Sequence, residues 1–252
     1  MSPGFRSGLV PVLLTALLAL LPLPAQAIVA GAEDAGPLSR AAIMVLSSRG
    51  GVCSGVVVAR DAILTAAHCV TGATDYRVHY RDDDGRPVLL EPAALAVHPG
   101  YDKGAVAGRR RSIDLALVRL GAPLPARFTP ATLTPASPSK GEAVTFGGYG
   151  VAREGDGRST GTFRTVELSA IEPYGRSTIL LWANGAAAAG ACEGDSGGPM
   201  TDGSGTVVAV TSWAAGDRAS GCGSMSQGIL VSPQRDWLDR TLAGWGRAAQ
   251  WR

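Results

Sequence analysis

The sequence of 252 residues has few charges, since only 17% of its residues are Asp, Glu, Lys or Arg and its formal net charge is +2. This balance excludes a strongly basic nucleic-acid-binding protein. Aromatic residues make up only 6%. Hydrophobic residues nevertheless reach 46%, too many for a disordered chain. The 34 glycines follow no three-residue period, which excludes collagen and indicates the many turns of an all-β chain.

Long hydrophobic runs are missing beyond the start of the chain. There, Arg6 precedes the apolar run Leu9–Leu21, and Ala25-Gln26-Ala27 follows it. This pattern is typical of a secretory signal peptide, residues 1–27, with cleavage after Ala27. A membrane anchor is the alternative, but the run is shorter than the ~20 residues that cross a bilayer. We therefore expect a secreted, extracellular protein that begins at Ile28 and has no membrane partner.

Cysteine and histidine are both scarce. The four cysteines have no C-x-x-C spacing, so a zinc ribbon or a thioredoxin-type site has little support. Export favours disulfides, and four cysteines allow three pairings. Of the three histidines, His79 and His98 lack metal-ligand spacing, and we expect both at the surface. We expect neither a metal nor a cofactor.

Short apolar runs alternate with turn-like segments along the chain. They are Val52–Ala59, Ala62–Ala67, Val88–Val97, Ile113–Leu120, Val144–Phe146 and Thr206–Trp213. Many short strands of this kind predict a barrel or a sandwich. The Pro/Ser-rich stretch Thr129–Lys140 predicts a crossover between two β halves, roughly residues 28–128 and 141–230.

One helix is predicted near the C-terminus. Ser232 can cap it, and Pro233 suits its first turn. An apolar stripe would pack this helix against the β core, and it consists of Trp237, Leu238, Leu242 and Trp245.

Ser196 is the candidate nucleophile, because glycines surround it in Gly194-Asp195-Ser196-Gly197-Gly198-Pro199. Glycine lets the backbone turn sharply and lets a substrate approach backbone N–H groups that can stabilise an oxyanion. The segment also fits G-x-S-x-G, whose enzymes order their residues as serine, acid, histidine. Every histidine here precedes Ser196, which disfavours an esterase or lipase of that type. Taken alone, the pattern could equally be a tight turn.

His68 and Asp114 are the candidate base and its partner. His68 ends an apolar run in Thr65-Ala66-Ala67-His68-Cys69, where a lone histidine is more often a packed core residue. Asp114 lies inside the apolar segment Ile113–Leu117. An unpaired buried carboxylate costs several kcal/mol, so Asp114 needs a hydrogen-bonded partner such as a histidine N–H. This pairing would fix the tautomer of His68.

Together these motifs resemble the chymotrypsin/trypsin family of secreted serine proteases. They are IVAG at Ile28, TAAHC at His68, DLAL at Asp114 and GDSGGP at Ser196, in the family's order. The resemblance implies an all-β fold of two six-stranded antiparallel β-barrels with a C-terminal α-helix. It also implies one serine protease domain, residues 28–252, with the catalytic residues in the cleft between the barrels.

The resemblance implies a role for each motif residue. Ser196 is expected as the nucleophile, His68 as the general base and then acid, and Asp114 as the orienting carboxylate. The backbone N–H groups of Gly194 and Ser196 are expected to form the oxyanion hole. The implied disulfides are Cys53–Cys69 and Cys192–Cys222.

Asp195 is expected to pair with the α-ammonium of Ile28, as the resemblance implies. An α-amino group has a reference pKa of ~8, so it is charged at neutral pH. Because the signal cleavage site directly precedes Ile28, we hypothesise that signal peptidase itself creates this ammonium, without a separate propeptide.

The resemblance also implies a set of substrate-binding residues, namely Gly190, Ser212, Trp213, Ala214 and Gly228. Gly190 is expected at the pocket floor and carries no charge, whereas a preference for Arg or Lys requires an acid there. The methyl group of Ala214 should narrow the pocket, and Gly228 should form the opposite wall. We expect small to medium apolar substrate side chains.

The sequence therefore predicts a secreted serine endopeptidase that forms an acyl-enzyme, acts as a monomer and takes protein or peptide substrates. The family also allows a proteinaceous inhibitor as a partner. We expect no nucleic-acid partner. The alternative is a catalytically inactive, protease-like binding module, which would normally lack a member of the triad.

Overall fold

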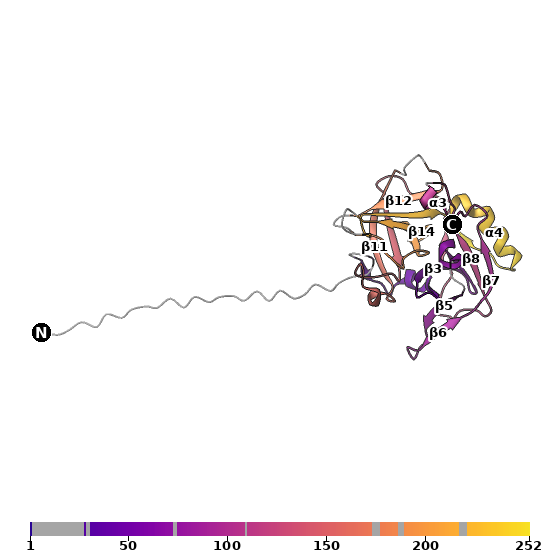
Figure 1. Cartoon of the computed structure of the whole chain (residues 1–252), viewed down its shortest axis with the longest axis horizontal. Helices are drawn as coiled ribbons and strands as arrows, with labels where there is room; N and C mark the ends of the chain where they lie inside the picture. Colours follow the sequence, from indigo (N-terminus) through magenta and orange to yellow (C-terminus); the bar gives the residue numbers. More distant parts are fainter. Residues whose placement is uncertain are drawn as a thin grey trace.

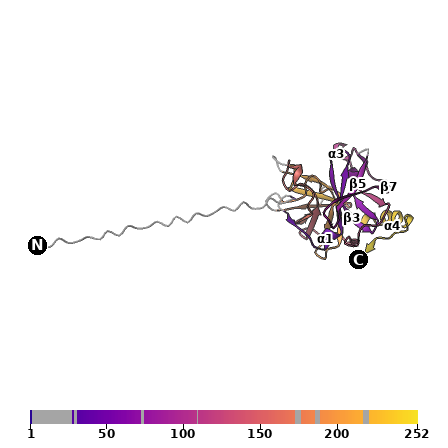
Figure 2. The same cartoon turned by 90° about the horizontal axis from the view of Figure 1, so that it is seen from below.

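A computed structural model describes residues 1, 28, 31–72, 75–108, 110–172, 177–185, 189–216 and 221–252 (Figure 1). Apart from residue 1, the expected signal peptide lies outside the described residues. Two β-barrels and a C-terminal helix form the body of the molecule, as Figures 1 and 2 show. Within the described ranges, no helix combines the length and the apolar character that crossing a bilayer requires. The predicted all-β class is confirmed.

The first barrel is built from an antiparallel seven-stranded sheet in the order β6-β5-β2-β3-β4-β8-β7. β6 pairs with β5 and β7 pairs with β8, so these two strands act as the halves of one bent strand that closes a six-stranded ring. The bend replaces the single strand expected over residues 88–97, because Pro92 has no N–H to donate to the ladder. The strands are β2 (Ala42–Ser47), β3 (Val52–Ala59), β4 (Ala62–Thr65), β5 (Tyr76–Arg81), β6 (Pro87–Leu90), β7 (Pro92–Val97) and β8 (Ala116–Leu120).

The second barrel closes because β13 pairs with both β10 and β14 in a nine-stranded sheet. Three two-residue strands are additions to this ring, which leaves six strands in the barrel. The ring contains β10 (Ala143–Gly148), β11 (Arg164–Ile171), β12 (Leu180–Asn184), β13 (Pro199–Thr201), β14 (Val207–Ala215) and β15 (Met225–Leu230). The additions are β1 (Ala32–Glu33), β9 (Thr132–Leu133) and β16 (Gln250–Trp251).

The short helices of the described residues lie in the connections. They are α1 (Pro37–Arg40), α2 (Ala67–Thr71), α3 (Ala105–Gly108), the 3₁₀ turns η1 (Gly157–Ser159) and η3 (Ser232–Gln234), and α4 (Arg235–Gly244). The predicted C-terminal helix is confirmed as α4, although Ser232 does not cap it. The Ser232 hydroxyl instead donates to the carbonyl of Pro135 at 2.5 Å, and the turn η3 precedes the helix.

Helix α4 closes the junction between the two barrels. Its Leu238 and Leu242 are fully buried with Val56 and Leu64 of the first barrel and Ile229 of the second. Each such side chain stabilises the fold by roughly 1.5–3 kcal/mol relative to its exposed state. This shared core fixes how the barrels meet, and therefore how residues far apart in the sequence meet at the site.

The expectation of a surface position for His98 is wrong. Its side chain is buried, with its ring centroid 4.7 Å from that of Trp237 on α4. Burial lowers the pKa of His98 below its usual value. The sequence gives no local sign of this, because the covering ring comes from the far end of the chain.

Candidate active site

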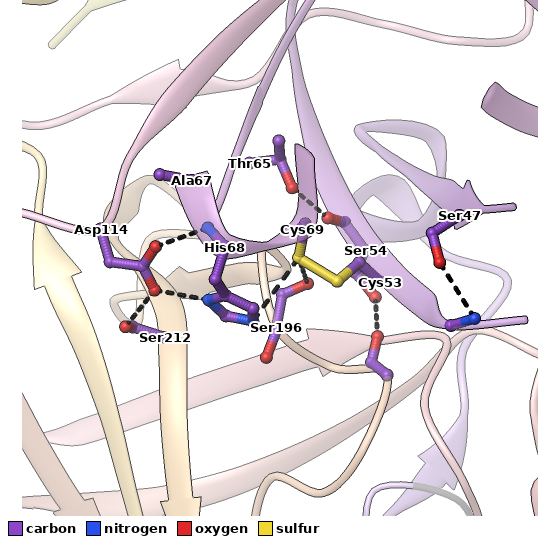
Figure 3. Close-up of a disulfide and its surroundings, with 12 residues drawn as sticks. Ser47, Cys53, Ser54, Thr65, Ala67, His68, Cys69, Asp114, Ser196 and Ser212 are labelled. Carbon is purple, nitrogen blue, oxygen red and sulfur yellow. Dashed lines mark hydrogen bonds and ion pairs between the residues drawn. A yellow bond between two sulfur atoms is a disulfide. The ribbon is translucent and has the colours of Figure 1, made fainter. Parts of the chain in front are cut away.

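His68 and Asp114 meet at the junction of the barrels. His68 lies in α2, directly after β4, and Asp114 lies just before β8, the neighbour of β4. The backbone N–H of His68 donates to Oδ1 of Asp114 at 2.9 Å, and Nδ1 lies 2.7 Å from Oδ2 (Figure 3). An ionised carboxylate only accepts, so Nδ1 carries a proton, and in the neutral ring Nε2 is then the acceptor.

Asp114 is buried but well supplied with donors. The Ser212 hydroxyl donates to Oδ2 at 2.7 Å, beside the His68 bond. Burial acts to raise the pKa of Asp114, but the hydrogen bonds from His68 and Ser212 outweigh it and hold the pKa below the usual value of 3.8. The carboxylate is therefore charged at neutral pH. The side chain of Ser212, a residue expected to bind substrate, thus points to Asp114.

Ser196 lies beside the imidazole of His68 in Figure 3. The Cys69 sulfur is 3.7 Å from Nε2 of His68 and 3.7 Å from the carbonyl oxygen of Ser196. That sulfur is in a disulfide and has no proton, so both are packing contacts. Among the described residues the Ser196 hydroxyl makes no hydrogen bond to the ring. Such bonds are often long without substrate and shorten in its complex.

Two backbone N–H groups belong to the segment that carries Ser196. Within the described part of the chain, the N–H groups of Gly194 and Ser196 donate to no protein acceptor. Gly194 has a φ of +96°, and a Cβ there would lie 2.7 Å from the Cα of Gly150. Only glycine fits both constraints. This pair of free donors can stabilise a developing oxyanion.

Asp195, which directly precedes Ser196, is buried. Its Oδ1 accepts from the N–H of Gly150 and its Oδ2 from that of Cys192, both at 2.9 Å. Burial raises the pKa of Asp195 to about 7, because these bonds and the positive charge of Arg164 offset the loss of hydration only in part. In the described residues the carboxylate has no ion pair. A cation that reached it would relieve an unfavourable buried charge.

Ile28 is fully buried in the core of the second barrel, together with Val144 and Ala191. In the uncut chain its nitrogen is an uncharged amide bonded to Ala27. Its φ is +42°, a value that β-branched residues rarely adopt. Cleavage before Ile28 would remove this backbone constraint and create an ammonium group.

We predict that Asp195 makes the uncut chain less stable as the pH rises from about 4 to above 7. The folded pKa of Asp195 lies above its unfolded value, so its stabilising effect is complete below about pH 3.8 and is lost as the pH passes 7. The expected loss is on the order of 4 kcal/mol. Urea unfolding across this range measures it. Asp195→Asn should remove the loss, and an equal slope in that variant would contradict the assignment.

Two of the residues expected to bind substrate, Gly190 and Ala214, both lie next to Ser226. Ser226 on β15 pairs with Ala214 on β14. A Cβ on Gly190 would lie 2.8 Å from the Ser226 hydroxyl, which accepts from the N–H of Ala191. Trp213 is partly exposed on the same strand, and its ring centroid is 5.9 Å from that of Trp182.

The predicted position of Gly228 needs correction. Gly228 pairs with Thr211, and a Cβ there would lie 2.1 Å from the Met200 sulfur, so it faces the barrel core. The residue opposite Ala214 is Ser226. A register shift in β14 between Thr211 and Trp213 moves the partner of Ala214 by one residue, from Met225 to Ser226, which spacing alone could not reveal.

The two disulfides hold the loops that carry these groups, and they are Cys53–Cys69 and Cys192–Cys222. Atoms of Cys53, His68 and Cys69 lie within 4.8 Å of one another. Both sulfurs of that group are oxidised, however, and a disulfide does not supply the thiolates that bind zinc.

The fold and the site define a class, the two-barrel β proteins of the serine protease type. The sequence profile described as Trypsin matches residues 28–238. The chain therefore belongs to the trypsin family of serine proteases.

The chain is similar in sequence to two named relatives. Brachyurin of Leptuca pugilator is 30% identical over 188 residues, which cover 68% of this chain and 77% of brachyurin. Granzyme M of Rattus norvegicus is 24% identical over 245 residues, 87% of this chain and 91% of that protein.

Solved structures support the fold. Mouse neuropsin, described as a serine protease, has a TM-score of 0.71 at 22% identity and covers 85% of this chain and 99% of its own. Human heparin binding protein has a TM-score of 0.71 at 22% identity, and the match covers 88% of this chain and 99% of that protein.

Proposed function

We propose that this protein is a secreted serine endopeptidase that uses Ser196, His68 and Asp114. One observation carries the proposal: the buried Asp114 holds the Nδ1–H of His68 and leaves Nε2 as an acceptor on the side where Ser196 lies. The free N–H groups of Gly194 and Ser196 supply the complementary donors.

The proposed reaction has two halves. Ser196 Oγ attacks the substrate carbonyl while its proton passes to Nε2 of His68, and the oxyanion accepts from the Gly194 and Ser196 N–H groups. The C–N bond then breaks, and the leaving amine takes the proton from Nε2. Water next attacks the acyl-enzyme, giving its proton to Nε2, and Ser196 regains a proton as the acid leaves. Asp114 stabilises the imidazolium in both halves.

The proposed activation is removal of the signal peptide. Cleavage after Ala27 would create an Ile28 ammonium in the same barrel as Asp195, whose buried carboxylate lacks a cation in the described chain. We also propose that the mature protein acts outside the cell as a monomer on protein or peptide substrates, and that a proteinaceous inhibitor regulates it by binding at the same site.

We predict a preference for small to medium apolar side chains before the cleaved bond. Gly190 brings no charge to the pocket, and an Arg or Lys buried there would lack a partner. In a peptide library, Ala, Val or Leu should exceed Arg and Lys by about 10²-fold in kcat/KM. Ala214→Gly should improve cleavage after Phe. Strong cleavage after Arg or Lys in the native protein would overturn this specificity.

The general proposal is tested by incubating the purified mature protein with casein and with simple esters. Cleavage of casein supports an endopeptidase, whereas ester hydrolysis without proteolysis indicates an esterase. A folded protein that cleaves neither and has the native Ile28 terminus would support the inactive binding module instead.

A further inference from the structure

Ser54 lies on β3 of the first barrel, yet its bonds reach the loop that carries the nucleophile. Its backbone N–H donates to the carbonyl of Ser196 at 2.7 Å. Its hydroxyl donates to the carbonyl of Gly194 at 2.9 Å and accepts from the N–H of Tyr149 at 2.9 Å. The side chain is fully buried. One residue therefore anchors two carbonyl groups of the catalytic loop.

The direction of these bonds is unambiguous. A carbonyl can only accept and an amide N–H can only donate, so the Ser54 proton points to Gly194. Thr65 in turn donates its hydroxyl to the carbonyl of Ser54 at 2.7 Å, which holds the Ser54 backbone in place (Figure 3). The loop packs tightly here, since a Cβ on Gly197 would lie 2.1 Å from the Ser54 carbonyl oxygen.

Gly194 has an anchored peptide plane on each side. The plane before it is held because the carbonyl of Glu193 accepts from the N–H of Val151 at 2.8 Å. The plane after it is held on its carbonyl side by the Ser54 hydroxyl and on its N–H side by the bond from Asp195 to the carbonyl of Cys192 at 3.1 Å. The free Gly194 N–H lies in the first plane. Because glycine rotates easily about φ and ψ, the angle between the two planes, and so the direction of this N–H relative to the rest of the loop, depends on the anchors of both. The Ser196 N–H is two residues further along the same loop.

We infer that Ser54 is a positioning residue, whose hydroxyl holds Gly194 in the conformation that aims the two free N–H groups at one point. This inference rests on the proposed hydrolytic function. Ser54 touches neither substrate nor the reacting atoms. Its effect should therefore appear in the stabilisation of the oxyanion and hardly at all in substrate binding.

We predict that Ser54→Ala lowers kcat for a peptide amide by about 10-fold with KM changed less than 2-fold. Loss of a whole oxyanion donor costs about 10²–10³-fold, and a misaligned donor costs less. The affinity for a peptide aldehyde, which forms an oxyanion on Ser196, should fall by the same factor as kcat/KM. Ser54→Thr retains the hydroxyl and should restore most of both.

The matched control is Thr134→Val, which removes another buried hydroxyl, one whose single partner among the described residues is the N–H of Ala136. It should leave kcat and aldehyde affinity unchanged.

Wild-type kcat and aldehyde affinity in Ser54→Ala, measured while the native protein is active, would overturn the inference. A native protein without activity would instead reject the proposed function. If Ser54→Ala does not fold, a crystal structure of the native aldehyde adduct decides: loss of the Ser54–Gly194 bond contradicts the inference, and its retention supports it.

Discussion

Ser196→Ala should lower kcat by about 10⁶-fold, as removal of the catalytic serine does in an analogous triad. The variant loses the only proposed atom that bonds to the substrate carbonyl. It retains the free N–H groups and the His68–Asp114 pair, so its residual rate should still exceed that of water by about 10³–10⁴-fold. Single-turnover and steady-state assays with the same peptide amide measure both values.

The fold should tolerate this change, because among described residues the Ser196 hydroxyl has no hydrogen-bond partner to lose. Thermal unfolding should therefore match that of the native protein. Ser204→Ala, in the exposed turn between β13 and β14, is the matched control and should remain fully active. A Ser196→Ala protein with more than about a tenth of native kcat would exclude Ser196 as nucleophile.

Two extra residues kept before Ile28 should lower kcat/KM by about 10²–10³-fold. The extended chain has no ammonium at Ile28, so Asp195 stays buried without a cation. Loss of one partner from a buried ion pair typically costs 3–5 kcal/mol, and here that cost falls on the loop that carries Gly194 and Ser196. Kinetics of the native and extended proteins, each confirmed by N-terminal sequencing, give the ratio.

The same two residues added after the exposed Arg252 provide the control and should have no effect. Equal activity of the N-terminally extended and native proteins would reject both the activating role of Ile28 and the idea that signal cleavage completes the enzyme. Secreted protein whose first residue is not Ile28 would reject the cleavage site alone.

Much of the fold and the site was predictable from local sequence. The run Val52–Ala59 has the length and β-branched content of a strand, and it forms β3 with the same bounds. Asp114 within an apolar segment required a buried partner, and the structure places it against His68. In both cases the prediction depends only on residues that are adjacent in the sequence.

The rest depended on contacts between distant segments. Ser54 is an ordinary strand residue in the sequence, and only the approach of the two barrels gives its hydroxyl a role. His98 is covered by a ring from α4, and the pairing of β14 with β15 places Ser226 rather than Gly228 opposite Ala214. Registers and inter-barrel contacts are set by the packing of the whole chain, so no local pattern encodes them.

The most direct test of the proposed catalytic site is labelling of the native mature protein with a peptide phosphonate, followed by mass spectrometry of its proteolytic fragments. An activated serine next to a base and an oxyanion hole reacts once, so we expect one phosphonyl group per chain, on Ser196. His68→Ala should abolish the labelling. A native protein that stays unmodified, or is modified at another residue, would contradict the account.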